Sequence, residues 1–279
     1  MTSRRANSKL KTQNSKLFHI TGRDNSLLRR ARAVRDGKAS ESIFLEGLRL
    51  CEEALRSGLK IEAAIYSEQL AKKDRAVELI EELERVAEKS ASVSETLLES
   101  ISYTKTPQGI IVLASRPAIE AEHFSAQQTS NPLLVILHRI NNPVNVGAIL
   151  RTAEAAGVTG VITTAGTADP FSPKALRGAM GSTLRLPAWN AVDYRQAIEW
   201  SRERSLQIVC ADVHGAKSFS EVDFRLPTAI VMGAESDGLS AEEVALTDVA
   251  VSIPMKGSTE SLNVAVAAGI LFYEAARQR

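Results

Sequence analysis

The 279-residue sequence is poor in cysteine, and it has no long apolar run. Its two cysteines, Cys51 and Cys210, are no basis for a disulfide framework or a metal site, so we expect each to be a small buried side chain. The longest uncharged apolar run, residues 264–273, is too short to cross a bilayer. The N-terminus is basic and polar without an apolar signal core, which predicts a cytoplasmic protein that does not enter a membrane.

The G-x-G-x-x-G and P-loop patterns are also missing, which argues against a dinucleotide-binding Rossmann enzyme. The net charge of +1 becomes informative only when it is divided along the chain. Residues 1–38 carry 11 Lys/Arg against 2 Asp/Glu, whereas residues 39–120 carry 10 against 15 and residues 121–279 carry 13 against 16. We therefore expect residues 1–20 to form a flexible basic arm, because the polar residues at its start cannot bury enough surface to order themselves.

Residues 25–35 have the spacing of a short helix with leucine, alanine and valine turned inward. Its outward side chains are Arg29, Arg30, Arg32 and Arg35. These arginines could contact RNA phosphates, since each neutralised phosphate releases counterions. An ordinary solvated helix face is the alternative.

Residues 21–116 are expected to form a small α/β domain, because strand and helix patterns alternate along them. The predicted strands are 42–46, 62–67 and 109–114, and the predicted helices are 47–57, 75–87 and 94–101. Residues 117–131, which are polar, are the expected linker.

Residues 132–279 predict a second α/β domain with a parallel sheet. Asn142 and Pro143 are placed to begin a helix that ends at Gly157, and Ser240 with Glu243 forms a capping box. The expected strands are 133–138, 161–164, 207–211, 229–232 and 249–253. A last helix over 262–276, with Ser261 as its cap, carries small residues that would let another backbone pack closely.

Three strings stand out in this second domain. They are NNPVNVGAILRTAEAAGV at residues 141–158, IVMGAESDGLS at 230–240 and SIPMKGSTESLNVAVAAG at 252–269. In their order and spacing they closely resemble the signature motifs of the SpoU/TrmH-type RNA ribose methyltransferases of the SPOUT superfamily. The resemblance implies a SPOUT fold, in which the C-terminal segment threads a loop to form a trefoil knot. It also implies S-adenosylmethionine as the methyl donor, a ribose 2′-hydroxyl of RNA as the acceptor and no metal.

Matched motif by motif, the resemblance implies a set of catalytic positions and a set of cofactor-binding positions. The catalytic set is Arg151, Asn145, Glu235, Ser261 and Asn263. The cofactor-binding set is Gly233, Ile253, Met255 and Leu262, with Thr163 or Thr164 nearby. Arginine is effectively always protonated, so Arg151 is better suited to orient the hydroxyl and stabilise a developing alkoxide than to act as a base. A carboxylate at Glu235 could hold Arg151 in a bidentate pair.

FLEGLRLCEEAL and TPQGIIVLAS, in the first domain, resemble the RNA-substrate-binding domain of the same family. Lys174 and Arg177, on a short helix that opens at Ser172 or Pro173, are further candidates for RNA contact. We expect a homodimer through the C-terminal domain. Large-subunit (23S) ribosomal RNA is the favoured substrate, and transfer RNA is the second. A ribosomal-RNA-binding or assembly factor that has lost activity is the non-enzymatic alternative. His19, His123, His138 and His214 match no catalytic motif.

Overall fold

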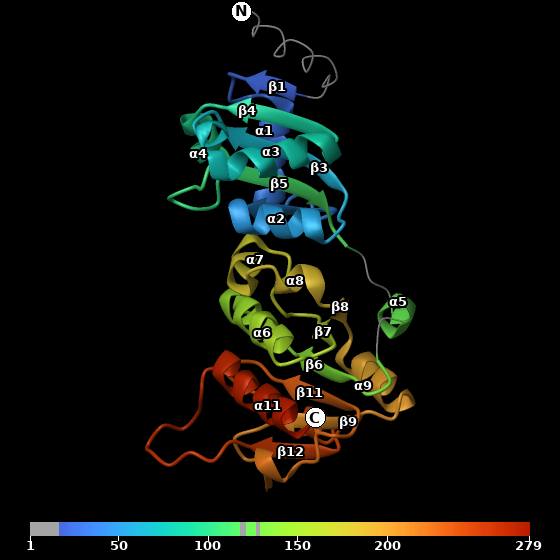
Figure 1. Ribbon diagram of the computed structural model, residues 1–279. Coiled ribbons are helices and arrows are strands. Elements are labelled where there is room, and N and C mark those ends of the chain that lie inside the picture. Colours follow the sequence, from blue (N-terminus) through green and yellow to red (C-terminus); the bar gives the residue numbers. More distant parts are fainter. Residues whose placement is uncertain (1–16, 118–120, 127–128) are drawn as a thin grey trace, which may run out of the picture. The chain divides into compact units, whose positions relative to one another are not determined.

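The chain forms two compact units, residues Met1–Ser115 and Arg116–Arg279, and each is described by itself. The computed structural model describes residues 17–117, 121–126 and 129–279 (Figure 1). Residues 1–16 of the expected arm and residues 118–120 and 127–128 of the expected linker lie outside these ranges.

The N-terminal unit is an α/β domain, as the alternating pattern predicts. Its elements are β1 (Leu17–Ile20), α1 (Ser26–Arg35), β2 (Ser42–Glu46), α2 (Leu48–Arg56), β3 (Ile61–Ser67), η1 (Leu70–Lys72), α3 (Asp74–Val86), β4 (Lys89–Val93), α4 (Glu95–Ile101) and β5 (Ile110–Ser115). The sheet has the order β1-β4-β3-β5-β2. β1, β4 and β3 run parallel, whereas β5 is antiparallel to β3 and β2. Every helix and strand predicted for this domain is present, with boundaries shifted by no more than one residue.

Two parts of the predicted layout are wrong. The expected flexible arm includes residues 17–20, but these form β1, which pairs with β4 through partners such as Ile20 and Val93. The expected linker contains a helix, α5 (Ala121–Ala126). Phe124 of α5 is fully buried and its ring lies 5.4 Å from that of Trp200, so this part of the linker packs on the C-terminal unit.

The C-terminal unit is built on one seven-stranded sheet. After α5 its elements are β6 (Leu133–Leu137), α6 (Pro143–Ala155), β7 (Gly160–Thr164), α7 (Pro173–Ala179), α8 (Ser182–Arg185), β8 (Ala188–Val192), α9 (Tyr194–Glu203), β9 (Gln207–Ala211), β10 (Lys217–Ser218), η2 (Phe219–Glu221), β11 (Thr228–Met232), α10 (Ala241–Val244), β12 (Val249–Ser252) and α11 (Val264–Gln278). The strand order is β10-β12-β9-β11-β6-β7-β8, and all neighbouring strands are parallel. The predicted parallel sheet is confirmed.

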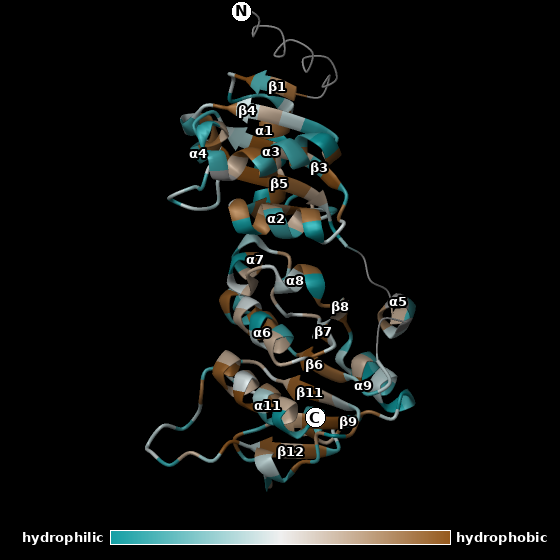
Figure 2. Ribbon diagram, in the orientation of Figure 1, coloured by the Kyte–Doolittle hydropathy of each residue, from teal (hydrophilic) through white to brown (hydrophobic). Residues whose placement is uncertain are grey.

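Both faces of this sheet are covered, which explains why its central strands are almost uniformly apolar (Figure 2). Leu133, Val135 and Leu137 of β6 point into a core shared with α6 and α11. Leu134 and Ile136 point into the opposite core, which contains residues of α9 and β8. Successive side chains of a strand alternate between faces, so one apolar strand serves both cores.

The last helix, α11, packs against α6, the helix that follows the first strand of the unit (Figure 1). A side chain on Gly269 would bring its Cβ to 3.4 Å from Thr152 Cγ2 of α6, so the small residues of α11 do allow a close approach. The predicted cap is wrong, because the helix begins after Asn263 and not after Ser261. The Asn263 side chain accepts a hydrogen bond from the backbone N–H of Ala265 over 2.9 Å.

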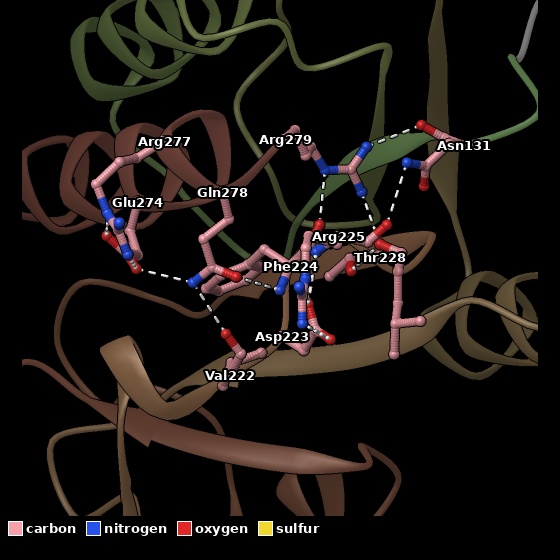
Figure 3. A network of polar contacts seen from close by, with 11 residues as sticks. Asn131, Val222, Asp223, Phe224, Arg225, Thr228, Glu274, Arg277, Gln278 and Arg279 are labelled. Atoms are coloured by element: carbon pink, nitrogen blue, oxygen red, sulfur yellow. Dashed lines mark hydrogen bonds and ion pairs between the residues drawn. The ribbon is translucent and has the colours of Figure 1, made fainter.

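The other end of α11 is fixed by Arg279 and Gln278 (Figure 3). The Arg279 guanidinium donates to the backbone carbonyls of Asn131, Pro132, Phe224 and Leu226 over 2.7–3.1 Å. Gln278 accepts from the Phe224 backbone N–H and donates to the Val222 carbonyl. These bonds hold the end of the helix against the segments that precede β6 and β11.

Candidate active site

The carboxyl ends of the parallel strands meet at one edge of the C-terminal sheet, which is where ligands bind in open α/β sheets. Because β9 lies between β11 and β12, the segments that follow these three strands are neighbours at that edge. Two of these segments carry the predicted second and third motifs. The remaining segment follows β9 and begins at Asp212, and it belongs to none of the three motifs.

The second motif is a loop, residues 233–240, that closes on itself. The backbone N–H of Gly238 donates to the Ala234 carbonyl over 3.1 Å, and Gly238 has a left-handed φ of 62°. A Cβ on Gly233 would lie 2.9 Å from the Gly238 carbonyl carbon and from Leu239 Cγ. A side chain at residue 233 would therefore collide with the other end of the loop, so the closed loop requires glycine at this position.

The third motif begins as an open segment. Residues 254–261 are all exposed, and the segment extends away from the sheet before it returns to α11 (Figure 1). Ile253 and Leu262 at its two ends are half-buried, whereas Met255 is 37% exposed. Ser261 is exposed as well. The two apolar side chains at the ends could form a wall for a flat ring.

The structure joins the first motif to the third. Asn145 lies in the first turn of α6 and is 7% exposed. Asn263 Nδ2 donates to Asn145 Oδ1 over 3.3 Å, across 118 positions of sequence. Since a buried amide needs hydrogen-bond partners, this contact fixes the position of both side chains.

Arg151 and Glu235 do not form the expected pair. Both side chains are exposed, and no hydrogen bond or ion pair between them is present in the described ranges. Arg151 follows Asn145 by six residues on the same helix, or about 9 Å along its axis. Its guanidinium faces solvent, so it is free to meet a substrate.

Thr163 and Thr164 lie apart from the other cofactor positions. They end β7, which β6 separates from β11. Thr163 Oγ1 donates to Asn190 Oδ1 over 3.2 Å, and Thr164 Oγ1 lies 2.8 Å from His138 Nδ1. Both hydroxyls are buried and have protein partners.

Residues 212–215 are better placed than Thr163 and Thr164 to contact a cofactor. They follow β9, and they lie between the loops that follow β11 and β12. Asp212 accepts from the His214 backbone N–H over 2.8 Å, Val213 is 61% exposed, and a Cβ on Gly215 would lie 2.5 Å from the Val251 carbonyl carbon. No sequence pattern marks this segment, because its place depends on the strand order.

Most of the arginines predicted to contact RNA have structural partners. Arg30 bonds to Glu41, Glu62 and Ser42, and Arg32 donates to the Arg23 carbonyl. Arg35 bonds to Asp36 and to the carbonyls of Ser100 and Ser102. Arg29 is exposed, as are Lys174 and Arg177 on α7. The helix is present as predicted, but three of its arginines help hold the domain together.

The described residues were also compared with what a membrane span and a metal site require. None of the helices in these residues has both the length and the apolar character needed to span a bilayer. No group of three His, Cys, Asp or Glu side chains among them lies close enough together to hold a metal ion.

A parallel α/β domain with motif loops at the carboxyl ends of its strands, preceded by a second α/β domain, defines a two-domain α/β protein. Residues 132–273 match the SpoU rRNA Methylase family, and residues 27–112 match the MRM3-like substrate binding domain. The chain belongs to the SpoU rRNA methylase family.

Relatives and solved structures agree with this assignment. The chain is 32% identical, over 95% of its length and 96% of the relative, to an uncharacterized tRNA/rRNA methyltransferase of Synechocystis sp.. It is 32% identical, over 87% of its length and 84% of the relative, to the 23S rRNA (uridine(2479)-2′-O)-methyltransferase of Streptomyces viridochromogenes. The crystal structure of an AdoMet-bound rRNA methyltransferase from Sinorhizobium meliloti has a TM-score of 0.83 and 28% identity, covering 94% of this chain and 98% of that one.

Proposed function

We propose that this protein transfers a methyl group from S-adenosylmethionine to a ribose 2′-hydroxyl of large-subunit ribosomal RNA in the cytoplasm. The observation that carries the proposal is the contact of Asn145 with Asn263, which brings two of the three motifs to one place. The sulfonium group of the cofactor supplies an activated methyl. Transfer of that methyl would break a carbon–sulfur bond, form a carbon–oxygen bond to the ribose, leave a neutral thioether and release the hydroxyl proton to water.

The residues present suit this cofactor. Gly233 allows the loop to close on itself, and the half-buried side chains of Ile253 and Leu262 offer apolar surface to an adenine ring. Asp212 and Glu235 lie on two of the segments at the same edge and would attract a positively charged sulfonium. The catalytic positions remain Asn145, Arg151, Glu235, Ser261 and Asn263, with Arg151 orienting the hydroxyl and stabilising the charge that develops on its oxygen.

We also propose that two copies complete each site through their C-terminal units, and that the C-terminal segment forms a trefoil knot. The exposed side chains of Val266 and Tyr273 on α11 and Val144 on α6 support the first point, since all three are apolar and from 45% to 55% exposed. Light scattering should report a dimer for the natural sequence and a monomer for Val266→Asp. A natural sequence that stays monomeric would contradict the dimer.

The N-terminal unit and the basic residues Arg29, Lys174 and Arg177 would hold the RNA, because they are exposed cations that can reach phosphates. Arg30, Arg32 and Arg35 would contribute chiefly by supporting the domain that holds Arg29.

The test uses the full chain, labelled S-adenosylmethionine, and total RNA from cells that lack the gene. Label should appear in 23S rRNA, at one nucleotide that resists 2′-hydroxyl-dependent cleavage. Label in transfer RNA alone would replace the substrate assignment. Calorimetry that detects RNA binding but no S-adenosylmethionine binding would favour a non-catalytic assembly factor and overturn the proposal.

A further inference from the structure

The Glu243 carboxylate joins the loop 233–240 to the edge of the sheet. Its Oε1 lies 3.0 Å from His138 Nε2, and its Oε2 accepts from Arg139 Nη2 over 2.8 Å. The same Oε2 accepts from the Ser240 backbone N–H over 2.8 Å, and Ser240 is the last residue of the loop. His138 and Arg139 directly follow β6, so one carboxylate connects the loop to the strand next to it.

His138 is fixed on its other side as well. Its ring is 5% exposed, lies 4.4 Å from the Tyr194 ring, and has Nδ1 at 2.8 Å from Thr164 Oγ1. Burial lowers the pKa of His138 and outweighs the opposing effect of Glu243. The neutral ring donates from Nε2 to Glu243 and accepts at Nδ1 from Thr164, so both ring nitrogens of His138 have a partner.

Arg139 takes up a backbone conformation that disfavours a side chain. Its φ is 56°, in the left-handed region where glycine is unstrained. Strain of this kind persists where surrounding contacts hold it, and it gathers at functional sites. The contact that Arg139 makes from this conformation is the ion pair with Glu243.

Apolar packing at this end of the loop is partial, because Leu239 and Val244 are only half-buried against the core on this face of the sheet. The helix α10, which follows the loop, has no buried residue. A pocket of about 290 Å³ opens beside it, lined by His138, Tyr194, Glu243 and their neighbours. The polar contacts of the Glu243 side chain add to this packing and join α10 directly to the residues that follow β6.

We infer that Glu243, held by His138 and Arg139, positions the loop 233–240 for cofactor binding without touching the reacting atoms. The inference rests on the proposed function, because it takes the occupant of that loop to be S-adenosylmethionine. The contacts of Glu243 with His138 and Arg139 lie on the β6 side of β11, whereas the segments that follow β9 and β12 lie on its other side. We therefore expect Glu243 to act through the backbone of the loop. Their loss should weaken cofactor binding and leave the methyl-transfer step unaltered once the cofactor is bound.

The test compares Glu243→Ala with Glu242→Ala, its exposed neighbour on the same helix, using calorimetry with S-adenosylmethionine on the full chain. Glu243→Ala should raise the Kd at least about tenfold and the KM for S-adenosylmethionine in parallel. It should change kcat at saturating cofactor less than about threefold. Glu242→Ala should match the natural sequence in all three. An unchanged Kd in a folded Glu243→Ala protein would overturn the inference.

Arg139→Gly separates positioning from stability. Glycine relieves the left-handed strain and removes the guanidinium, so the thermal midpoint should hold or rise while the Kd still increases severalfold. A Kd that stays at the natural value in this variant would remove Arg139 from the inference. If the natural sequence binds no S-adenosylmethionine, the proposed function fails. In that case, the rate of amide hydrogen exchange in residues 233–240 tests the positioning role by itself. Faster exchange in Glu243→Ala than in Glu242→Ala would support the role, and equal rates would overturn it.

Discussion

Asn263 donates from its side chain to Asn145 Oδ1 while its own Oδ1 accepts from the Ala265 backbone N–H. One amide thus starts the last helix and holds a buried amide of α6. Both bonds are needed at once, since the buried Asn145 has no solvent to replace a lost partner. The contact couples the stability of α11 to the geometry of the candidate site.

Substitutions at Asn263 should separate these two roles. Asn263→Ser keeps a capping oxygen but is too short to reach Asn145, whereas Asn263→Ala loses both bonds. We expect Asn263→Ala to lower the free energy of unfolding by about 2 kcal/mol and Asn263→Ser by about 1 kcal/mol. Both should lose most methyl transfer. Denaturant unfolding and a filter assay with labelled cofactor measure the two effects, and full activity in Asn263→Ser would contradict the role of the pair.

Arg151→Ala should lower turnover about 100-fold to 1000-fold, the range seen when one donor to a developing oxyanion is removed. Folding and cofactor affinity should hold, because Arg151 is exposed and makes no internal contact in the described structure. Arg225→Ala is a matched control, since that exposed arginine pairs with Asp223 at the opposite edge of the sheet. Turnover within tenfold of the natural sequence would remove Arg151 from the chemistry.

Stability should fall as the pH drops below about 6.5, the ordinary pKa of histidine. The lowered pKa of His138 means that the unfolded chain takes up a proton before the folded one does, so protons favour unfolding. Hydrogen bonds from Ser240 and His138 outweigh burial and lower the pKa of Glu243, whose contribution disappears at still lower pH. The denaturant midpoint should fall less between pH 7 and pH 5 in His138→Gln than in His214→Gln. The second variant is the control, because it replaces an exposed histidine. Parallel slopes would contradict the assignment.

Arg279→Ala should lower the free energy of unfolding by about 1–2 kcal/mol, because its guanidinium donates to four carbonyls from two segments (Figure 3). Arg277→Ala is the control, since Arg277 is exposed and pairs with Glu274 on the same helix. That change should leave the urea midpoint close to that of the natural sequence, because solvent screens an exposed ion pair. Equal midpoints for the two variants in urea would show that the carbonyl contacts contribute nothing.

Removing residues 1–16 takes away 5 Lys/Arg and no Asp/Glu. RNA affinity should weaken, and its log–log dependence on salt should become shallower by as much as about 3.5, or about 0.7 for each cation removed. Cofactor affinity should be unaffected. The deletion stops before β1, since a longer one would remove a strand of the sheet. Fluorescence titrations at several salt concentrations measure the slope, and an unchanged slope would refute a role for these residues in binding.

The sequence predicted the fold well where apolar spacing and capping residues act together. The helix after Asn142 and the strands 42–46 and 207–211 are examples, because their signals are local. β4, with the sequence KSASV, was missed because three of its five residues are polar. The helix α5 was missed because its burial depends on Phe124 meeting tryptophans far along the chain.

The residues of the candidate site could be chosen from the sequence, but their neighbours in space could not. The motif residues Asn145 and Asn263 meet, whereas β6 separates Thr163 and Thr164 from β11, and this strand order cannot be read from the sequence. Arg30 was predicted to be available because charge patterns do not show that Glu62, 32 positions away, folds against it. The role of Glu243 beyond its capping box depends equally on a distant partner, His138.

The attachment of α11 at both ends has a consequence for how the protein is made. Asn263 at one end and Arg279 at the other contact segments that leave the ribosome much earlier, around residues 131 and 145. The first domain can fold during synthesis, since domains fold as units and the N-terminal one emerges first. The second domain cannot hold α11 at both ends until Arg279 has been made, so its candidate site forms later than the first domain.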